Sequence, residues 1–128
     1  MSTHLDPITN HLLAALPPEA RERVFPHLKL MKLPLGRVVY EAGQTAQYVY
    51  FPIDCIISLL YVMLNGSSAE ISVVGNEGIV GIAVFMGGES TPSRAIVQSA
   101  GSAYRLPASE LRKEFNGYAE MRMLMLRY

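Results

Sequence analysis

The chain has 128 residues, of which 50% are hydrophobic and 17% are charged, and it carries 11 basic and 11 acidic side chains. This length suits one domain with a single core, the composition excludes a disordered chain, and the balanced charge excludes the basic surface that nucleic-acid binding requires. The chain has one cysteine, Cys55, so it can form no disulfide within the chain. An iron–sulfur cluster held by cysteines would need several of them. Because we find neither a signal peptide nor an apolar run long enough to cross a bilayer, we expect a cytoplasmic protein without membrane contact.

Residues 1–29 are predicted to form a helical arm. Asp6 is placed as an N-cap and Pro7 as the first residue of a helix. Pro17 ends this helix, and a second one is expected from Pro18 to about Pro26. The apolar residues of the first helix recur at helical spacing, which predicts packing on the rest of the domain; they are Ile8, Leu12, Leu13 and Leu16.

Residues 30–106 consist of short apolar runs separated by turn residues, a pattern typical of an all-β domain. The sharpest turn signal is Asn65-Gly66, which predicts a hairpin between the runs 56–64 and 69–74. We therefore expect a mainly β fold, a double-stranded β-helix or jelly-roll barrel, with helices before and after it.

Residues 107–128 are predicted to be helical. A short helix is expected to end near Gly117, where glycine permits a left-handed residue. A new helical pattern then runs from Tyr118 to the last residue, and one side of it is apolar, which indicates packing in the core or between two copies of the chain. The residues on that side are Met121, Leu124, Met125 and Tyr128.

The segment 75–101 carries the most information about function. Gly78 and Gly81 begin an apolar run, two further glycines turn the chain, and the strand 94–97 returns after a polar loop. Glycines at this spacing allow a backbone to approach a bound group closely.

This segment, together with the strand and glycine turn at 38–44, the strand at 48–53 and the helix at 106–115, resembles the cyclic-nucleotide-binding domain of Crp/Fnr transcription regulators. The resemblance covers roughly residues 13–128. It implies a jelly-roll sensor domain that binds a small-molecule effector and forms a homodimer through its C-terminal helix. It also implies that DNA is contacted only by a helix-turn-helix domain outside this chain. The ligand contacts that it implies are Gly78, Gly81, Ile82, Ser93, Arg94 and Ala95.

The segment departs from the family at two positions that matter for cyclic AMP. Ile79 and Ile82 follow the glycines where the family has a glutamate for the ribose. Ser93 occupies the place of the phosphate-binding arginine, and Arg94 comes one residue later, which turns it to the other face of a strand. We therefore predict that cyclic AMP is not bound in the family's usual way, that the chain has no cofactor and that the effector is another small molecule.

Two interpretations of Arg94 stay open at this point, an anion contact and an outward ion pair with a residue such as Glu77 or Glu89. For Cys55 we favour a buried structural role over thiol chemistry, because no basic residue adjoins it.

All three histidines precede the predicted strands, so we expect neither a metal site nor an enzyme. The competing functional hypothesis is a protein-interaction module with a vestigial pocket.

Overall fold

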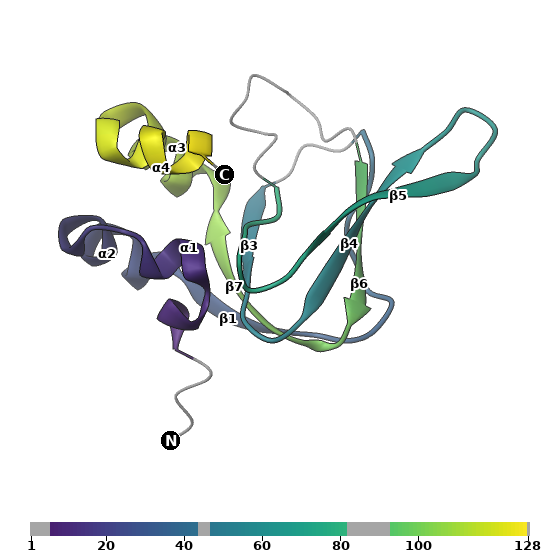
Figure 1. The fold of residues 1–128 in the computed structure, drawn as a ribbon, viewed down its shortest axis with the longest axis horizontal. Coiled ribbons are helices and arrows are strands. Elements are labelled where there is room, and N and C mark those ends of the chain that lie inside the picture. Colours follow the sequence, from purple (N-terminus) through teal and green to yellow (C-terminus); the bar gives the residue numbers. More distant parts are fainter. Residues whose placement is uncertain (1–5, 44–46, 82–92, 128) are drawn as a thin grey trace.

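The computed structural model describes residues 6–43, 47–81 and 93–127, with the side chain of Val62 left out. Two antiparallel sheets lie face to face, and the helices from both ends of the chain cover the outer face of the smaller sheet (Figure 1). This arrangement confirms the predicted mainly β jelly-roll fold with helices before and after it. The expected closed barrel is not formed by the described strands, which stay in two separate sheets.

The smaller sheet has the strand order β1 (Lys29–Leu33), β7 (Gly101–Pro107) and β3 (Tyr48–Pro52). Its side chains alternate between the two faces, as strand geometry requires. Val49 and Leu106 are fully buried on the face that meets the helices, whereas Ala103 is buried on the face that meets the larger sheet. This sheet is therefore the middle layer of three.

The larger sheet has the strand order β2 (Val38–Tyr40), β6 (Ser93–Ser99), β4 (Ile56–Val62) and β5 (Ser68–Val74). The predicted hairpin between β4 and β5 is confirmed, and Gly66 adopts the positive φ of 88° that its turn requires. The hairpin projects from the body of the molecule (Figure 1), and β5 is exposed over most of its length.

The chain has two hydrophobic cores because the middle sheet is covered on both sides. One core lies between this sheet and the helices, and the other lies between the two sheets. The second core is made of small and medium side chains, which include Leu33, Cys55, Ile57, Ala95 and Val97.

The N-terminal arm is helical and packs on the domain, as predicted, but it begins differently. Asp6 and Pro7 take the predicted N-cap and first helical positions, but Pro7–Thr9 forms only a 3-10 turn (η2) and the Asp6 side chain makes no capping hydrogen bond. The first α-helix, α1, is His11–Ala14, and the side chain of Asn10 caps it. Asn10 is the better cap at this place because its side-chain amide also donates hydrogen bonds to carbonyl groups of the sandwich. An aspartate such as Asp6 has no side-chain N–H group with which to make them. The arm continues with α2 (Pro18–Val24) and the 3-10 turn η3 (Phe25–His27).

The chain after the sandwich forms α3 (Ala108–Gly117) and α4 (Ala119–Arg127). Gly117 does not take the predicted left-handed conformation. The helix stops instead at Tyr118, which is extended with φ −137° and still donates its backbone N–H to Glu114. Among the described helices, none is both long and apolar enough to cross a membrane.

Candidate functional site

The segment 75–101 enters the sandwich directly beside β3. The backbones of Val80 and Tyr50 exchange two hydrogen bonds, of 2.8 and 3.0 Å. Gly81 follows with φ 104°, and a Cβ atom placed there would lie 3.3 Å from the carbonyl oxygen of Tyr48. Glycine is therefore required at 81 both by its backbone angle and by the close approach to β3.

Gly78 is buried and makes a contact within the protein. Its carbonyl oxygen accepts a hydrogen bond of 2.8 Å from the Asn10 side chain. Ile79, which stands where the family has a ribose-binding glutamate, is 2% exposed and packs in the core beneath the helices. The position after Gly78 thus offers no carboxylate to a ligand, whereas the exposed Glu77 accepts a hydrogen bond of 3.0 Å from the Gly75 backbone N–H. Ile82 lies outside the described residues.

The structure separates the three predicted contacts on β6. Ser93 and Ala95 are buried on the face that looks toward the smaller sheet. Arg94 lies on the opposite face, where its Nη2 donates to Glu41 Oε2 at 3.0 Å and its Nε lies 2.9 Å from Oε1. The ion-pair partner of Arg94 is therefore Glu41 of the turn after β2 rather than Glu77.

The hydroxyl groups of Tyr40 and Ser93 lie together at the inward position where the family has its phosphate-binding arginine. Tyr40 packs against the core between the sheets. Burial raises the pKa of Tyr40, and a hydrogen bond with Ser93 partly offsets this increase. Both side chains are neutral at physiological pH, so they provide hydrogen bonds here and no positive charge.

Cys55 belongs to the same core and is 1% exposed. Burial raises the pKa of the thiol to about 11, and the neighbouring Asp54 adds to the shift. The burial predicted for Cys55 is thus confirmed, and the raised pKa disfavours the thiolate, which is the reactive form of cysteine. No cluster of three or more metal-ligating side chains occurs in the part of the chain that the structure describes.

Sequence reasoning missed a group of aromatic and cationic side chains on the inner face of the smaller sheet. Arg105 on β7 pairs in register with Tyr50 on β3, and its guanidinium carbon lies 4.0 Å from the centroid of the Tyr48 ring. Arg105 also forms a hydrogen bond with the Tyr50 hydroxyl. The two-residue period of β7 places Arg105 on the same face as Ala103 but does not show which layer that face meets.

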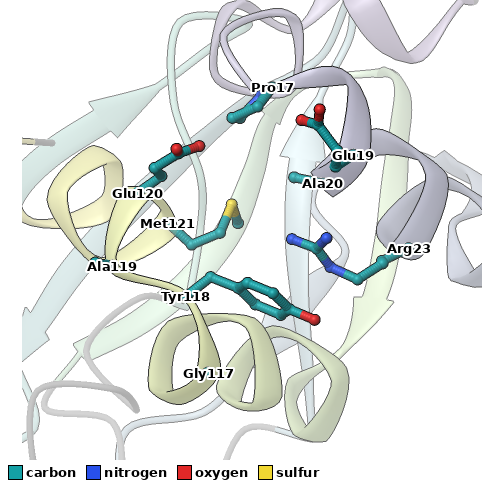
Figure 2. Close-up of a pocket in the computed structure, with 9 residues that line it drawn as sticks. All are labelled: Pro17, Glu19, Ala20, Arg23, Gly117, Tyr118, Ala119, Glu120 and Met121. Atoms are coloured by element: carbon teal, nitrogen blue, oxygen red, sulfur yellow. The ribbon is translucent and has the colours of Figure 1, made fainter.

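A cavity of about 410 Å³ lies elsewhere, between α2 and the junction of α3 with α4 (Figure 2). Arg23 lies at this cavity with its guanidinium 3.6 Å from the Tyr118 ring centroid, and two of its nitrogens each lie 2.9 Å from a Glu114 oxygen. The hydrogen bond with Glu114 raises the pKa of Arg23 further above its usual value. The lining residues come from the two helical regions and none belongs to the segment 75–101; they are Pro17, Glu19, Ala20, Arg23, Gly117, Tyr118, Ala119, Glu120 and Met121.

The predicted dimer contacts are split by the structure. Met121 and Met125 are buried at 1% and 2% exposure in the core of their own chain, and Leu124 packs against that core. Tyr128 lies outside the described residues. The exposed apolar side chains of α4 are Met123 and Leu126, at 65% and 59%.

Two antiparallel sheets, a glycine-containing segment between β5 and β6 and helices that cover the smaller sheet define a jelly-roll domain of the ligand-sensing type. The family model of the cyclic nucleotide-binding domain matches residues 30–118, and the chain belongs to this family. No curated protein matches the chain.

Solved structures extend the comparison to regulators. The sensor domain of the transcriptional regulator DNR from Pseudomonas aeruginosa superposes with a TM-score of 0.77 at 15% identity, over 91% of this chain and 79% of that one. The N-terminal domain of a transcriptional regulator from Streptomyces coelicolor gives a TM-score of 0.67 at 19% identity, over 97% and 84% of the two chains. The regulatory subunit of a cAMP-independent protein kinase A from Trypanosoma brucei gives 0.75 at 13% identity, over 92% of this chain and 42% of that one. The resemblance to sensor domains of Crp/Fnr regulators is thus confirmed for the fold.

Proposed function

We propose that this domain senses a small-molecule effector for a Crp/Fnr-type transcription regulator and that it does not hold cyclic AMP through the family's usual arginine. The observation that carries the second part is the outward ion pair of Arg94 with Glu41. The inward side of β6 presents the hydroxyl of Ser93 instead. A cyclic phosphate buried at this position of β6 would lack the cationic partner that the family's arginine supplies there, which would be strongly disfavoured.

A protein of similar fold is described as independent of cyclic AMP. The similar regulatory subunit from Trypanosoma brucei is described as part of a cAMP-independent kinase. Membership of the family therefore does not make cyclic AMP the effector of this chain.

A connected set of contacts supports transmission from the segment 75–81 to the C-terminal helices. Asn10 joins this segment to α1 through Gly78. Farther along the arm, Arg23 of α2 holds Glu114 of α3, and His27 lies 3.1 Å from Glu110. A ligand that binds one arrangement of these elements better than another would shift the helices accordingly.

Native mass spectrometry of the protein purified from its own host tests the proposal. We expect a non-covalent adduct of one discrete mass that is released on unfolding. Amide hydrogen exchange of α3 and α4 is expected to differ between the occupied and the emptied protein. The absence of an adduct together with unchanged exchange after addition of a host metabolite extract would contradict a sensor function.

A second candidate function is a protein-interaction module, and the exposed apolar residues of α4 favour it. Met123 and Leu126 face solvent, whereas Met121 is held in the core. A sensor that dimerises through this helix and a module that binds a partner through it would use the same exposed side chains. The two functions differ in the bound small molecule, which only the sensor requires.

Exchanging Leu126 for glutamate is expected to weaken self-association of the protein about tenfold or more, because a charge would enter an apolar contact. Sedimentation velocity over a concentration series measures the effect. Leu64→Glu serves as the matched control, because Leu64 is fully exposed at the tip of the β4–β5 hairpin. Equal association of the wild-type, Leu126→Glu and Leu64→Glu proteins would exclude α4 as the contact.

A further inference from the structure

The inner face of the smaller sheet carries a cationic side chain next to the segment 75–81. Ala103, two residues before Arg105 on β7, is fully buried in the core between the sheets. Leu106, the residue after Arg105, is buried in the core beneath the helices. Because successive side chains of a strand point to opposite faces, Arg105 projects toward the space between the sheets.

Arg105 is held on this face by two tyrosines of β3. Its guanidinium lies 4.0 Å from the centroid of the Tyr48 ring. It also donates a hydrogen bond to the hydroxyl of Tyr50, which packs against the core between the sheets. These contacts fix the direction of the guanidinium, and because both tyrosines are neutral, they do not themselves compensate its charge.

The charge of Arg105 also acts on the titration of Tyr50. Burial raises the pKa of Tyr50, and the charges of Arg105 and Arg37 act against this increase. The described ion pairs involve Arg23, His27, Arg94 and Lys113. Within residues 6–43, 47–81 and 93–127, neither Arg37 nor Arg105 therefore has a carboxylate partner.

Arg105 and the two tyrosines lie next to the segment 75–81, where we expect a ligand to enter. Tyr50 is the residue whose backbone holds Val80, and Tyr48 is the residue that Gly81 approaches. A molecule lying between the sheets at this end of β3 would meet Arg105 on one side. It would find the hydroxyl groups of Tyr40 and Ser93 on the larger sheet, and no described carboxylate on these strands faces it from either side.

We propose that this face binds the oxyanion group, a phosphate or a carboxylate, of a small molecule, with Arg105 as its charged contact. The proposal rests on the sensor function proposed above and makes the effector an anion. A guanidinium fits either oxyanion because its N–H groups form two parallel hydrogen bonds. The contact with Tyr48 is made with the ring centroid and so does not use the N–H groups as ordinary hydrogen-bond donors, which leaves them for such a ligand.

Titration of the isotope-labelled protein, followed by NMR of the arginine Nε–Hε and backbone amide signals, tests this assignment. The probes are phenyl phosphate, benzoate and cyclic AMP, each added as the sodium salt against a sodium chloride control. We expect saturable shifts of the Arg105 Nε–Hε and Tyr50 amide signals with at least one probe. Phenyl phosphate and benzoate distinguish a phosphate site from a carboxylate site.

Arg105→Gln is expected to weaken binding of that probe about tenfold, the effect of losing a charge-assisted contact. The matched control is Arg94→Gln, which removes the arginine on the outer face of β6 and should leave binding unchanged. Arg105→Lys keeps the positive charge but loses the paired N–H groups of the guanidinium, so it should bind with intermediate affinity. A graded series of affinities would show that the loss in Arg105→Gln does not come from misfolding.

Two results would overturn the assignment. One is loss of binding in Arg94→Gln with retained binding in Arg105→Gln, and the other is the absence of saturable shifts with all three probes. Neither result alone contradicts the sensor function, because a neutral effector would still be found by native mass spectrometry.

Discussion

Replacement of Asn10 by alanine is expected to lower the free energy of unfolding by about 3–5 kcal/mol, since it removes a helix cap and leaves buried carbonyl groups without donors. Asn10 has no exposed surface. Its Oδ1 accepts from the backbone of Leu12 and Leu13 at 3.0 and 3.1 Å. Its Nδ2 donates to the carbonyl groups of Pro52 and Gly78 at 2.9 and 2.8 Å. Urea unfolding followed by circular dichroism measures the change.

Two further variants separate the parts of this effect. Asn10→Asp keeps the capping oxygen and loses the Nδ2 donors, so a large destabilisation in this variant would assign most of the effect to Pro52 and Gly78. Asn116→Ala is the control, because Asn116 is exposed and a change there should stay within about 0.5 kcal/mol. Near-equal stability of Asn10→Ala and Asn116→Ala would contradict the role of Asn10 as the link between the arm and the segment 75–81.

Gly101→Ala is expected to destabilise the protein by about 3 kcal/mol through overlap with backbone atoms. A Cβ atom at this position would lie 2.6 Å from Asp54 Oδ1 and 2.7 Å from the Asp54 carbonyl oxygen. Asp54 cannot easily give way, because its Oδ1 accepts the backbone N–H of Ser102 at 2.5 Å. The chain before β4 and the start of β7 would have to separate. Thermal unfolding measures the loss.

The matched control is Gly117→Ala at the end of α3. No atom lies within 4 Å of a Cβ built on Gly117, and its φ is not positive. Alanine should therefore be neutral there or raise stability by a few tenths of a kcal/mol, because it restricts the unfolded chain. A Gly101→Ala protein as stable as Gly117→Ala would show that the Asp54 turn can move freely.

Local turn chemistry predicted the strands better than the helix ends. Asn65-Gly66 specified its hairpin because the loop between the paired residues Val62 and Ser68 needs a positive φ at one position, which Gly66 supplies. The start of α1 was misplaced because Asp6 and Asn10 both suit an N-cap. The choice between them depends on carbonyl groups 42 and 68 residues away in the sequence.

The facing of β6 could be predicted from the alternation of side chains, but the partner of Arg94 could not. Glu41 lies 53 residues before Arg94 and reaches it only through the pairing of β2 with β6. Arg105 was missed for a different reason. The middle sheet is covered on both faces, so apolar residues occur on both sides of β7 and the pattern does not reveal which side looks toward the other sheet.

The exposed strand β5 gives the larger sheet a free edge, since its described partner is β4 alone. Ile71 and Val73 are 58% and 45% exposed on this strand. An edge of this kind invites pairing with strands of other molecules. Glu70 lies in the middle of β5 and accepts a hydrogen bond from Ser58, which places a charge within the edge. A charge at this place opposes pairing of the edge with strands of other molecules, so we expect Glu70 to protect the domain against aggregation while this edge stays uncovered.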